Sequence, residues 1–147
     1  MPKAPVPAPS ERRFQCVEGC TACCRRPGTI VITREDAARI AAHFKLSLRR
    51  FEHRYTERVH GQTRLRLLGP EQRCPFLGGD DVKGWCNIHA VKPLQCATYP
   101  FWPGVADNSR GWQREMATCP GIGQGPDHSR EWIQIQVRAA SATATGR

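Results

Sequence analysis

The cysteines are the residues of this sequence with the clearest chemistry. Four of them lie within one stretch of nine residues, spaced C-x3-C-x2-C-C: Cys16, Cys20, Cys23 and Cys24. Four more follow singly: Cys74, Cys86, Cys96 and Cys119. A thiol is easily oxidised and is the softest ligand that a side chain offers, so a dense group of thiols indicates either disulfides or a bound metal. All eight are therefore candidate metal ligands.

The choice between disulfides and metal depends on the cellular compartment. An even number of cysteines permits a disulfide framework, but such frameworks belong to oxidising compartments. The sequence has no apolar run of secretory length after Lys3, and no apolar stretch long enough to span a membrane. We therefore expect a cytoplasmic protein without a membrane segment, whose thiols bind metal rather than each other. A disulfide between the adjacent Cys23 and Cys24 would also close a strained ring.

The spacing favours an iron–sulfur cluster over a zinc ion. A zinc module usually has two short pairs of ligands, whereas here only Cys20 and Cys23 form a C-x2-C pair. Several thiolates on one short loop are typical of iron–sulfur proteins, although the spacing matches neither ferredoxin pattern. Adjacent side chains diverge in helix and strand, so Cys23 and Cys24 fit two corners of a large cluster, or two sites, better than one ion. The eight thiols suffice for two four-cysteine sites, or for one such site with spare thiols. We predict a 4Fe–4S cluster, with zinc as the alternative.

Capping residues and apolar periodicity predict helices in both halves of the chain. Thr33 with Asp36 three residues on resembles a capping box, and Ser47 is a second candidate N-cap. The predicted helices cover these ranges: 33–44, 47–59 and 129–140. β-Branched or alternating runs predict short strands at 29–32 and 64–68, and we also expect short strands at 85–86 and 111–118. The segment 69–125 is rich in Gly and Pro, so we expect it to be mostly loop.

These elements predict one small, irregular α+β domain organised around metal, with two N-terminal helices, short strands, a loop-rich cysteine segment and a C-terminal helix. The chain has 147 residues, of which 39% are hydrophobic, 13 are Gly and 12 are Pro, so it builds only a modest core. Metal cross-links would add folding free energy directly. We expect a disordered Pro-rich tail at 1–13, a single metal-binding domain at 14–140 and a frayed tail at 141–147.

Positive charge gathers on the second predicted helix. The formal net charge is +9. The arginines that fall opposite the apolar stripe of this helix are Arg49, Arg50, Arg54 and Arg58. A basic face attracts acidic protein or nucleic acid, but no recognisable nucleic-acid-binding motif accompanies it. We therefore expect this face to dock a protein partner and to lie outside the chemical site, with nucleic acid less favoured and a plain solvated surface as the alternative.

Several motifs in one order carry a family resemblance. After the C-x3-C-x2-C-C run come C-P-F-L at 74–77, C-x-I-H-x3-P-x2-C-x2-Y-P-F at 86–101 and C-x-G-I-G at 119–123. This pattern resembles the YkgJ-type cysteine-cluster family, whose members are described as zinc- or iron-chelating and often as iron–sulfur proteins. Lys92 and Ala97 stand where the family often has Arg. The resemblance implies a metal site with cysteine ligands and does not imply a reaction.

The other polar and aromatic residues indicate no catalytic machinery. His89 is expected to pack beside the metal site rather than to bind the metal, and Tyr99, Phe101 and Trp102 are expected to shield it from water. The remaining histidines are expected on the surface: His43, His53, His60 and His128. No Ser-His-Asp constellation or phosphate loop occurs. We therefore expect a metal-binding protein with a redox, sensing or accessory role that is not an enzyme on its own; a zinc interaction module or an iron- or zinc-handling protein is the alternative.

Overall fold

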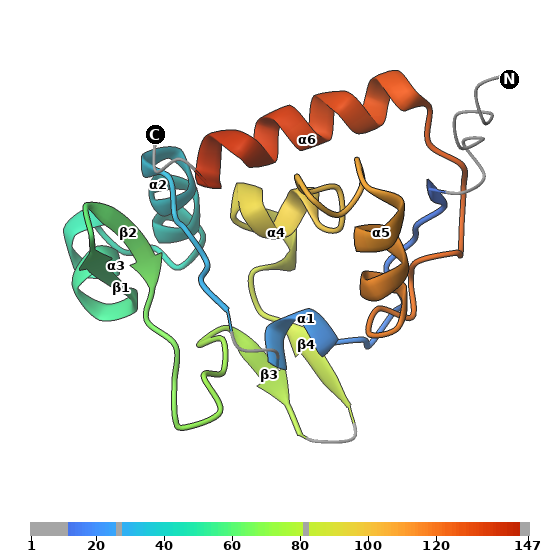
Figure 1. Cartoon of the computed structure of the whole chain (residues 1–147). Coiled ribbons are helices and arrows are strands. Elements are labelled where there is room, and N and C mark those ends of the chain that lie inside the picture. Colours follow the sequence, from blue (N-terminus) through green and yellow to red (C-terminus); the bar gives the residue numbers. More distant parts are fainter. Residues whose placement is uncertain (1–11, 26–27, 81–82, 145–147) are drawn as a thin grey trace, which may run out of the picture.

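The computed structural model describes residues 12–25, 28–80 and 83–144. These residues form six α-helices, a short 3-10 helix and two small antiparallel sheets of two strands each (Figure 1). This content confirms the predicted α+β class. Within the same ranges, no helix combines the length and the apolar character that are needed to cross a bilayer.

The first two long helices begin at the predicted residues. α2, Arg34–His43, starts at Thr33, whose hydroxyl accepts a hydrogen bond from the Asp36 N–H while the Asp36 carboxylate accepts one from the Thr33 N–H, each at 3.0 Å. This reciprocal pair is a capping box. α3, Leu48–Tyr55, starts at Ser47, whose hydroxyl accepts a hydrogen bond from the Arg50 N–H at 3.2 Å.

α3 ends earlier than predicted, because the residues after Tyr55 leave the helix and form a hairpin. β1, Thr56–Val59, pairs antiparallel with β2, Gln62–Leu65. His60 and Gly61 make the turn between them, with φ angles of 49° and 78°. Two consecutive positive φ angles are what a tight two-residue hairpin turn requires. Gly61 therefore closes a hairpin and does not end a helix.

The structure also corrects two of the predicted strands. Residues 29–32 do not form a regular strand; only Val31 makes an isolated bridge, to Arg64 in β2. The N–H of Ile32 donates to the neighbouring hairpin at 2.9 Å, so this segment lies alongside β2 without extending the sheet. The strand predicted at 64–68 is β2 itself, which covers residues 62–65.

The segment 69–125 holds more regular structure than predicted. β3, Leu77–Gly79, pairs antiparallel with β4, Gly84–Cys86, which confirms the strand at 85–86. A 3-10 helix, His89–Val91, and α4, Leu94–Thr98, follow. The stretch 111–118 was predicted as a strand, but residues 111–116 belong to a helix and residues 117 and 118 to the turn after it.

That helix is α5, Ser109–Met116. It begins at Asn108, whose side-chain oxygen accepts from the Gly111 N–H at 3.0 Å. Gly111 is required there, because a Cβ would lie 1.9 Å from the Gly104 carbonyl oxygen. The helix buries Trp112 against the core. The strand prediction was wrong because it overlooked this N-cap.

The ends of the described chain differ slightly from the predicted boundaries. α6, Arg130–Ala144, confirms the terminal helix and runs beyond residue 140, and it packs against α4. At the other end, Arg12 and Arg13 donate side-chain hydrogen bonds to backbone carbonyls of residues 106 and 125, each at 2.8 Å. The packed part of the chain therefore begins before residue 14. The predicted tails at 1–11 and 145–147 lie outside the described residues.

The apolar core consists of two clusters. The first is built around Ile40 and Phe51, on α2 and α3. The second is built around Phe101 and Trp112, near α5 and α6. Cys74 belongs to the first cluster, Cys24 and Cys86 pack against it, and Cys119 packs against the second.

Candidate metal centre

Backbone hydrogen bonds hold the N-terminal cysteine run at both of its ends. Just before the run, the Gln15 N–H donates to the Gly121 carbonyl at 3.1 Å. At the end of the run, the Cys74 N–H donates to the Cys24 carbonyl at 3.3 Å. These bonds join the run to two segments that lie far away in the sequence and that carry cysteines of their own.

One helical turn presents the two adjacent cysteines of the run. This turn is α1, Ala22–Arg25, which the sequence did not predict. The Arg25 guanidinium donates to the Thr21 hydroxyl at 2.8 Å and to the Asp80 carbonyl at 2.7 Å. Thr21 packs closely on β4, since a Cβ added at Gly84 would lie 2.8 Å from its methyl carbon. Glycine at position 84 therefore lets α1 and β4 approach each other.

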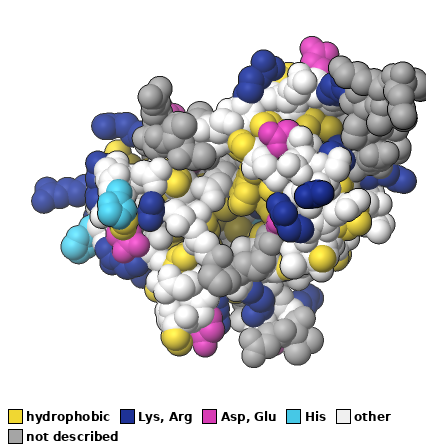
Figure 2. All heavy atoms as spheres, viewed as in Figure 1, with side chains coloured by type: hydrophobic (Ala, Val, Ile, Leu, Met, Phe, Trp, Pro, Cys, Tyr) yellow, Lys and Arg dark blue, Asp and Glu magenta, His cyan; other side chains and the backbone are white. Residues whose placement is uncertain are grey.

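The cysteines surround one cavity of about 790 Å³. Seven of the eight line it: Cys16, Cys20, Cys23, Cys24, Cys74, Cys86 and Cys96. Figure 2 shows hydrophobic side chains, a class that includes cysteine in this view, gathered around a depression in the middle of the face. Cys119 is not part of the lining, but it lies close enough to Cys16 to raise the pKa of that thiol. The fold thus brings the predicted site residues together, and their role as ligands stays a prediction.

A hydrogen-bond network centred on Asp36 positions the segment 92–96, which forms part of the cavity wall. Asp36 is 1% exposed, and its carboxylate accepts from the Leu94 N–H at 3.0 Å. It also pairs with the Arg39 guanidinium at 2.8 Å, which in turn donates to the Lys92 carbonyl at 2.7 Å. The sequence indicated Asp36 only as a capping residue, and its contact with this wall was missed.

Gln95 connects two further parts of the wall. Its side-chain oxygen accepts from the Val31 N–H at 2.9 Å, and its side-chain nitrogen donates to the Thr29 carbonyl at 2.7 Å. Its own carbonyl accepts from the indole N–H of Trp102 at 2.8 Å. Gln95 therefore holds the segment before α2 against α4, and no sequence pattern had singled it out.

Hydrogen bonding among the thiols shifts their pKa values in opposite directions. Contacts with Cys23, Cys74 and Cys86 raise the pKa of Cys24 well above its ordinary value. The contact with Cys24 lowers the pKa of Cys74, and it lowers the pKa of Cys86 to about 6, although burial opposes both shifts. Cys24 therefore holds its proton more tightly than an ordinary thiol, while Cys74 and Cys86 lose theirs more readily.

At two other thiols of the cavity, burial is the largest cause of the pKa shift. It raises the pKa of Cys96 to about 12 and also raises that of Cys16, and neighbouring thiols act in the same direction. The Lys92 ammonium opposes the rise at both positions and helps to lower the pKa of Cys86. Lys92 lines the cavity, so it is a cation that faces several thiols at once.

The thiols have the right chemistry for a metal, but their contacts do not yet form a coordination sphere. All eight cysteines are free thiols and none forms a disulfide. Thiolates suit zinc and iron–sulfur clusters. Over residues 12–25, 28–80 and 83–144, however, no three His, Cys, Asp or Glu side chains form a group that could hold a metal ion. Coordination therefore requires the thiols to rotate or shift within the cavity.

The aromatic and histidine predictions are met only in part. Tyr99 and Trp102 line the cavity, and the Tyr99 hydroxyl donates to the Glu115 carboxylate at 2.5 Å. Phe101 instead belongs to the second apolar cluster. The histidines divide as follows: His89 lines the cavity, His43, His53 and His60 are exposed, and His128 is half-buried with its ring 4.2 Å from that of Trp132.

A small α+β domain whose cysteines converge on one cavity has the architecture of a cysteine-rich metal-chelating domain. The family model CxxCxxCC, described as "Putative zinc- or iron-chelating domain", matches residues 15–120. This match covers well over half of the chain, so the chain belongs to this family, which confirms the resemblance seen in the sequence. No solved structure matches the chain.

Proposed function

We propose that the protein holds an iron–sulfur cluster in the cysteine-lined cavity and serves a redox, sensing or accessory role. The observation that supports this proposal most is the convergence of seven thiols from four separate segments on one cavity. A zinc ion needs four ligands around one point, with Zn–S distances of about 2.3 Å. In a cluster the thiolates bind different iron atoms, so sulfurs spread around a cavity are suitable ligands.

Two groups of thiols are the proposed ligands. The inner group consists of Cys24, two thiols that hydrogen-bond with it and a half-buried thiol that interacts with these: Cys24, Cys74, Cys86 and Cys96. The outer group is made up of the remaining four: Cys16, Cys20, Cys23 and Cys119. Cys23 borders both groups, since it contacts Cys24 and acts on the pKa of Cys16. We assign a 4Fe–4S cluster to the inner group and leave the outer group for a second site or for spare thiols.

The residues around the inner group would tune such a cluster. A bound iron–sulfur cluster supplies one-electron redox chemistry whose potential depends on nearby charge, hydrogen bonds and solvent access. Lys92 contributes positive charge beside the thiols, and Tyr99 and Trp102, which line the cavity, would limit the access of water. Free thiols in this number fit a reducing compartment such as the cytoplasm. We propose no catalytic role for the protein by itself.

Zinc is the second candidate, because the family description names zinc beside iron. Zinc would make the domain a redox-inert structural or interaction module, or a metal-handling protein. The two candidates differ in acid-labile sulfide, which only a cluster contains.

The test is anaerobic purification followed by measurement of iron, zinc and sulfide per protein, together with the visible absorbance of sulfur-to-iron charge transfer. We expect iron and sulfide in equal amounts, and their loss in Cys24→Ser. Ala22→Ser is the matched control, because it adds the same hydroxyl to α1 without removing a thiol, and it should retain both. Stoichiometric zinc without sulfide would replace the cluster with the zinc proposal. A folded, metal-free protein from a reducing cytoplasm would overturn both.

A further inference from the structure

A second hollow, of about 820 Å³, lies on α3, away from the cysteines. Its lining residues define what we call the arginine hollow: Leu46, Arg49, Arg50, His53, Arg54 and Arg66. No residue lines both this hollow and the cysteine cavity. It is therefore a separate surface feature, and the metal chemistry does not explain it.

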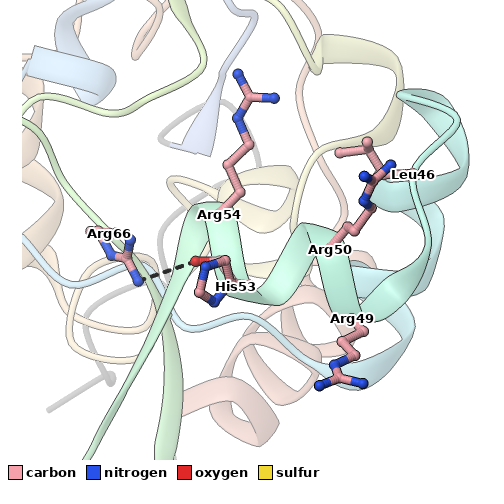
Figure 3. A pocket seen from close by; sticks show the side chains of 6 residues that line it. All are labelled: Leu46, Arg49, Arg50, His53, Arg54 and Arg66. Atoms are coloured by element: carbon pink, nitrogen blue, oxygen red, sulfur yellow. Dashed lines mark hydrogen bonds between the residues drawn. The ribbon is translucent and has the colours of Figure 1, made fainter.

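The arginines come from two different elements. Figure 3 shows Arg49, Arg50 and Arg54 extending from α3 in different directions, with Arg66 reaching in from the segment after β2. Arg58, which the sequence placed on the same face, is instead in β1, where its guanidinium donates to Thr63. The hairpin that ends α3 thus removes one predicted arginine from this face and adds another.

Two of these arginines are held in place by their neighbours. The Arg66 guanidinium donates to the Thr56 carbonyl at 2.9 Å and to the His53 carbonyl at 3.3 Å. The Arg54 guanidinium lies 5.3 Å from the centre of the Tyr55 ring, in a cation–π contact. Fixing a long side chain before binding reduces the entropy that a partner must overcome. This part of the hollow is therefore preorganised.

We propose that the arginine hollow docks an acidic segment of a partner protein. No Asp or Glu occurs among the lining residues of the hollow, so nothing in its lining neutralises the four guanidinium groups. A guanidinium presents paired N–H groups that match a carboxylate in a bidentate manner. Several carboxylates on one short peptide could therefore each bind a different arginine. The formal net charge of +9 favours the approach of such a peptide over longer distances.

An acidic peptide fits better than a nucleic acid. A nucleic-acid backbone follows a continuous positive track, whereas Glu52 in α3 and Glu57 in β1 are both exposed and interrupt the charge along this part of the chain. Single strands also need exposed aromatic rings on which bases stack. Tyr55 is half-buried beneath Arg54 and does not line the hollow.

One stretch of chain, residues 65–67, contributes to both the arginine hollow and the cysteine cavity. Leu65 and Leu67 line the cavity, while Arg66 between them lines the hollow. Neighbouring side chains in extended chain point to opposite faces. A peptide that binds Arg66 would thus contact the residue between two side chains of the cavity wall, which places the partner close to the proposed metal centre without taking part in it.

The experiment measures binding of a fluorescein-labelled peptide of ten glutamates by anisotropy, over a range of salt concentrations. Arg50→Glu with Arg54→Glu should weaken binding about tenfold or more at low salt, since two attractions become repulsions. The matched control is Arg110→Glu with Arg114→Glu, an exposed pair at the same four-residue spacing on α5. Both double variants change the formal net charge by the same amount. The control should nevertheless lose much less affinity for the peptide, because its arginines lie outside the hollow.

Three outcomes would overturn the proposal. An equal loss of peptide affinity in the two double variants would mean that only the overall charge of the protein matters for binding. Tighter binding of a ten-nucleotide oligothymidylate, weakened by the same α3 substitutions, would assign the hollow to nucleic acid. No binding of the peptide at low salt would leave the hollow without this function. Iron and sulfide content is measured on each variant; it should be unchanged, so failure of the docking proposal and failure of the iron–sulfur proposal are distinguishable.

Discussion

The substitution Asp36→Asn tests whether the network around Asp36 holds the cavity wall. In the native protein one carboxylate oxygen accepts from the Thr33 N–H, and the other accepts from the Leu94 N–H and pairs with Arg39. Asparagine has nearly the same size, but its amide NH2 group cannot accept a hydrogen bond. One of the two backbone N–H groups therefore loses its partner, and the other keeps only a neutral acceptor.

The expected loss of stability is about 2 kcal/mol. Losing the capping-box contact at Thr33 accounts for about 1 kcal/mol, the usual effect of removing a helix N-cap interaction. Replacing a charged acceptor by a neutral one at Leu94 accounts for about 1 kcal/mol more. The ion pair with Arg39 adds little, because the Arg39 side chain is 43% exposed and solvent screens the pair.

Urea unfolding at fixed metal loading measures this loss, with Glu35→Gln as the matched control. Glu35 is exposed in the same first turn of α2, so the control removes the same charge from the helix N-terminus without touching the network. We also expect faster amide exchange across residues 92–98 in Asp36→Asn only. If Asp36→Asn is no less stable than Glu35→Gln, or if exchange in 92–98 is unchanged, the network does not hold this wall.

Two further predictions concern the contact between α1 and β4 and the effect of removing the metal. Gly84→Ala should destabilise the protein by about 1–3 kcal/mol and lower its metal content, because the new Cβ would lie 2.8 Å from the Thr21 methyl carbon and push α1 from β4. Gly28→Ala, with nothing within 4 Å of its Cβ, is the control, and equal metal content in the two variants would contradict the role given to this contact. Removing the metal with a chelator should expose the amides of residues 69–125 to exchange before those of α2 and α3. Unchanged protection across 69–125 after complete metal loss would mean that the cysteines in this segment are core residues rather than ligands.

The sequence predicted best those elements whose signals are local. Thr33 and Ser47 start helices through contacts with residues three positions away, so both helix starts were predicted correctly. The end of α3 depends on a hairpin partner: Val59 continues the apolar spacing of a helix, and only pairing with β2 makes it a strand residue. Asn108 was overlooked as a cap, and the strand predicted over α5 was wrong for that reason.

For the candidate site, the sequence identified the residues but not their arrangement in space. Thiol chemistry alone selected the eight cysteines, and the fold places seven of them around one cavity. Their arrangement depends on single contacts between distant residues, such as the Cys74–Cys24 backbone bond and the two bonds of the Gln95 side chain. A glutamine in a short helix carries no sequence signal for such a role.

The position of Arg66 connects the docking proposal with the iron–sulfur proposal, because Arg66 lines the hollow and its sequence neighbours line the cavity. Its neighbours Leu65 and Leu67 line the cysteine cavity, and Leu65 is buried in the first apolar cluster. A close-packed wall of this kind transmits a shift on one face to the other, because its side chains have little free space. If peptide binding at Arg66 changes the affinity of the cavity for metal, metal loading must change the affinity for the peptide by the same factor. If both proposals hold, a partner docked at Arg66 would therefore sense the metal state of the cavity without any contact with the metal.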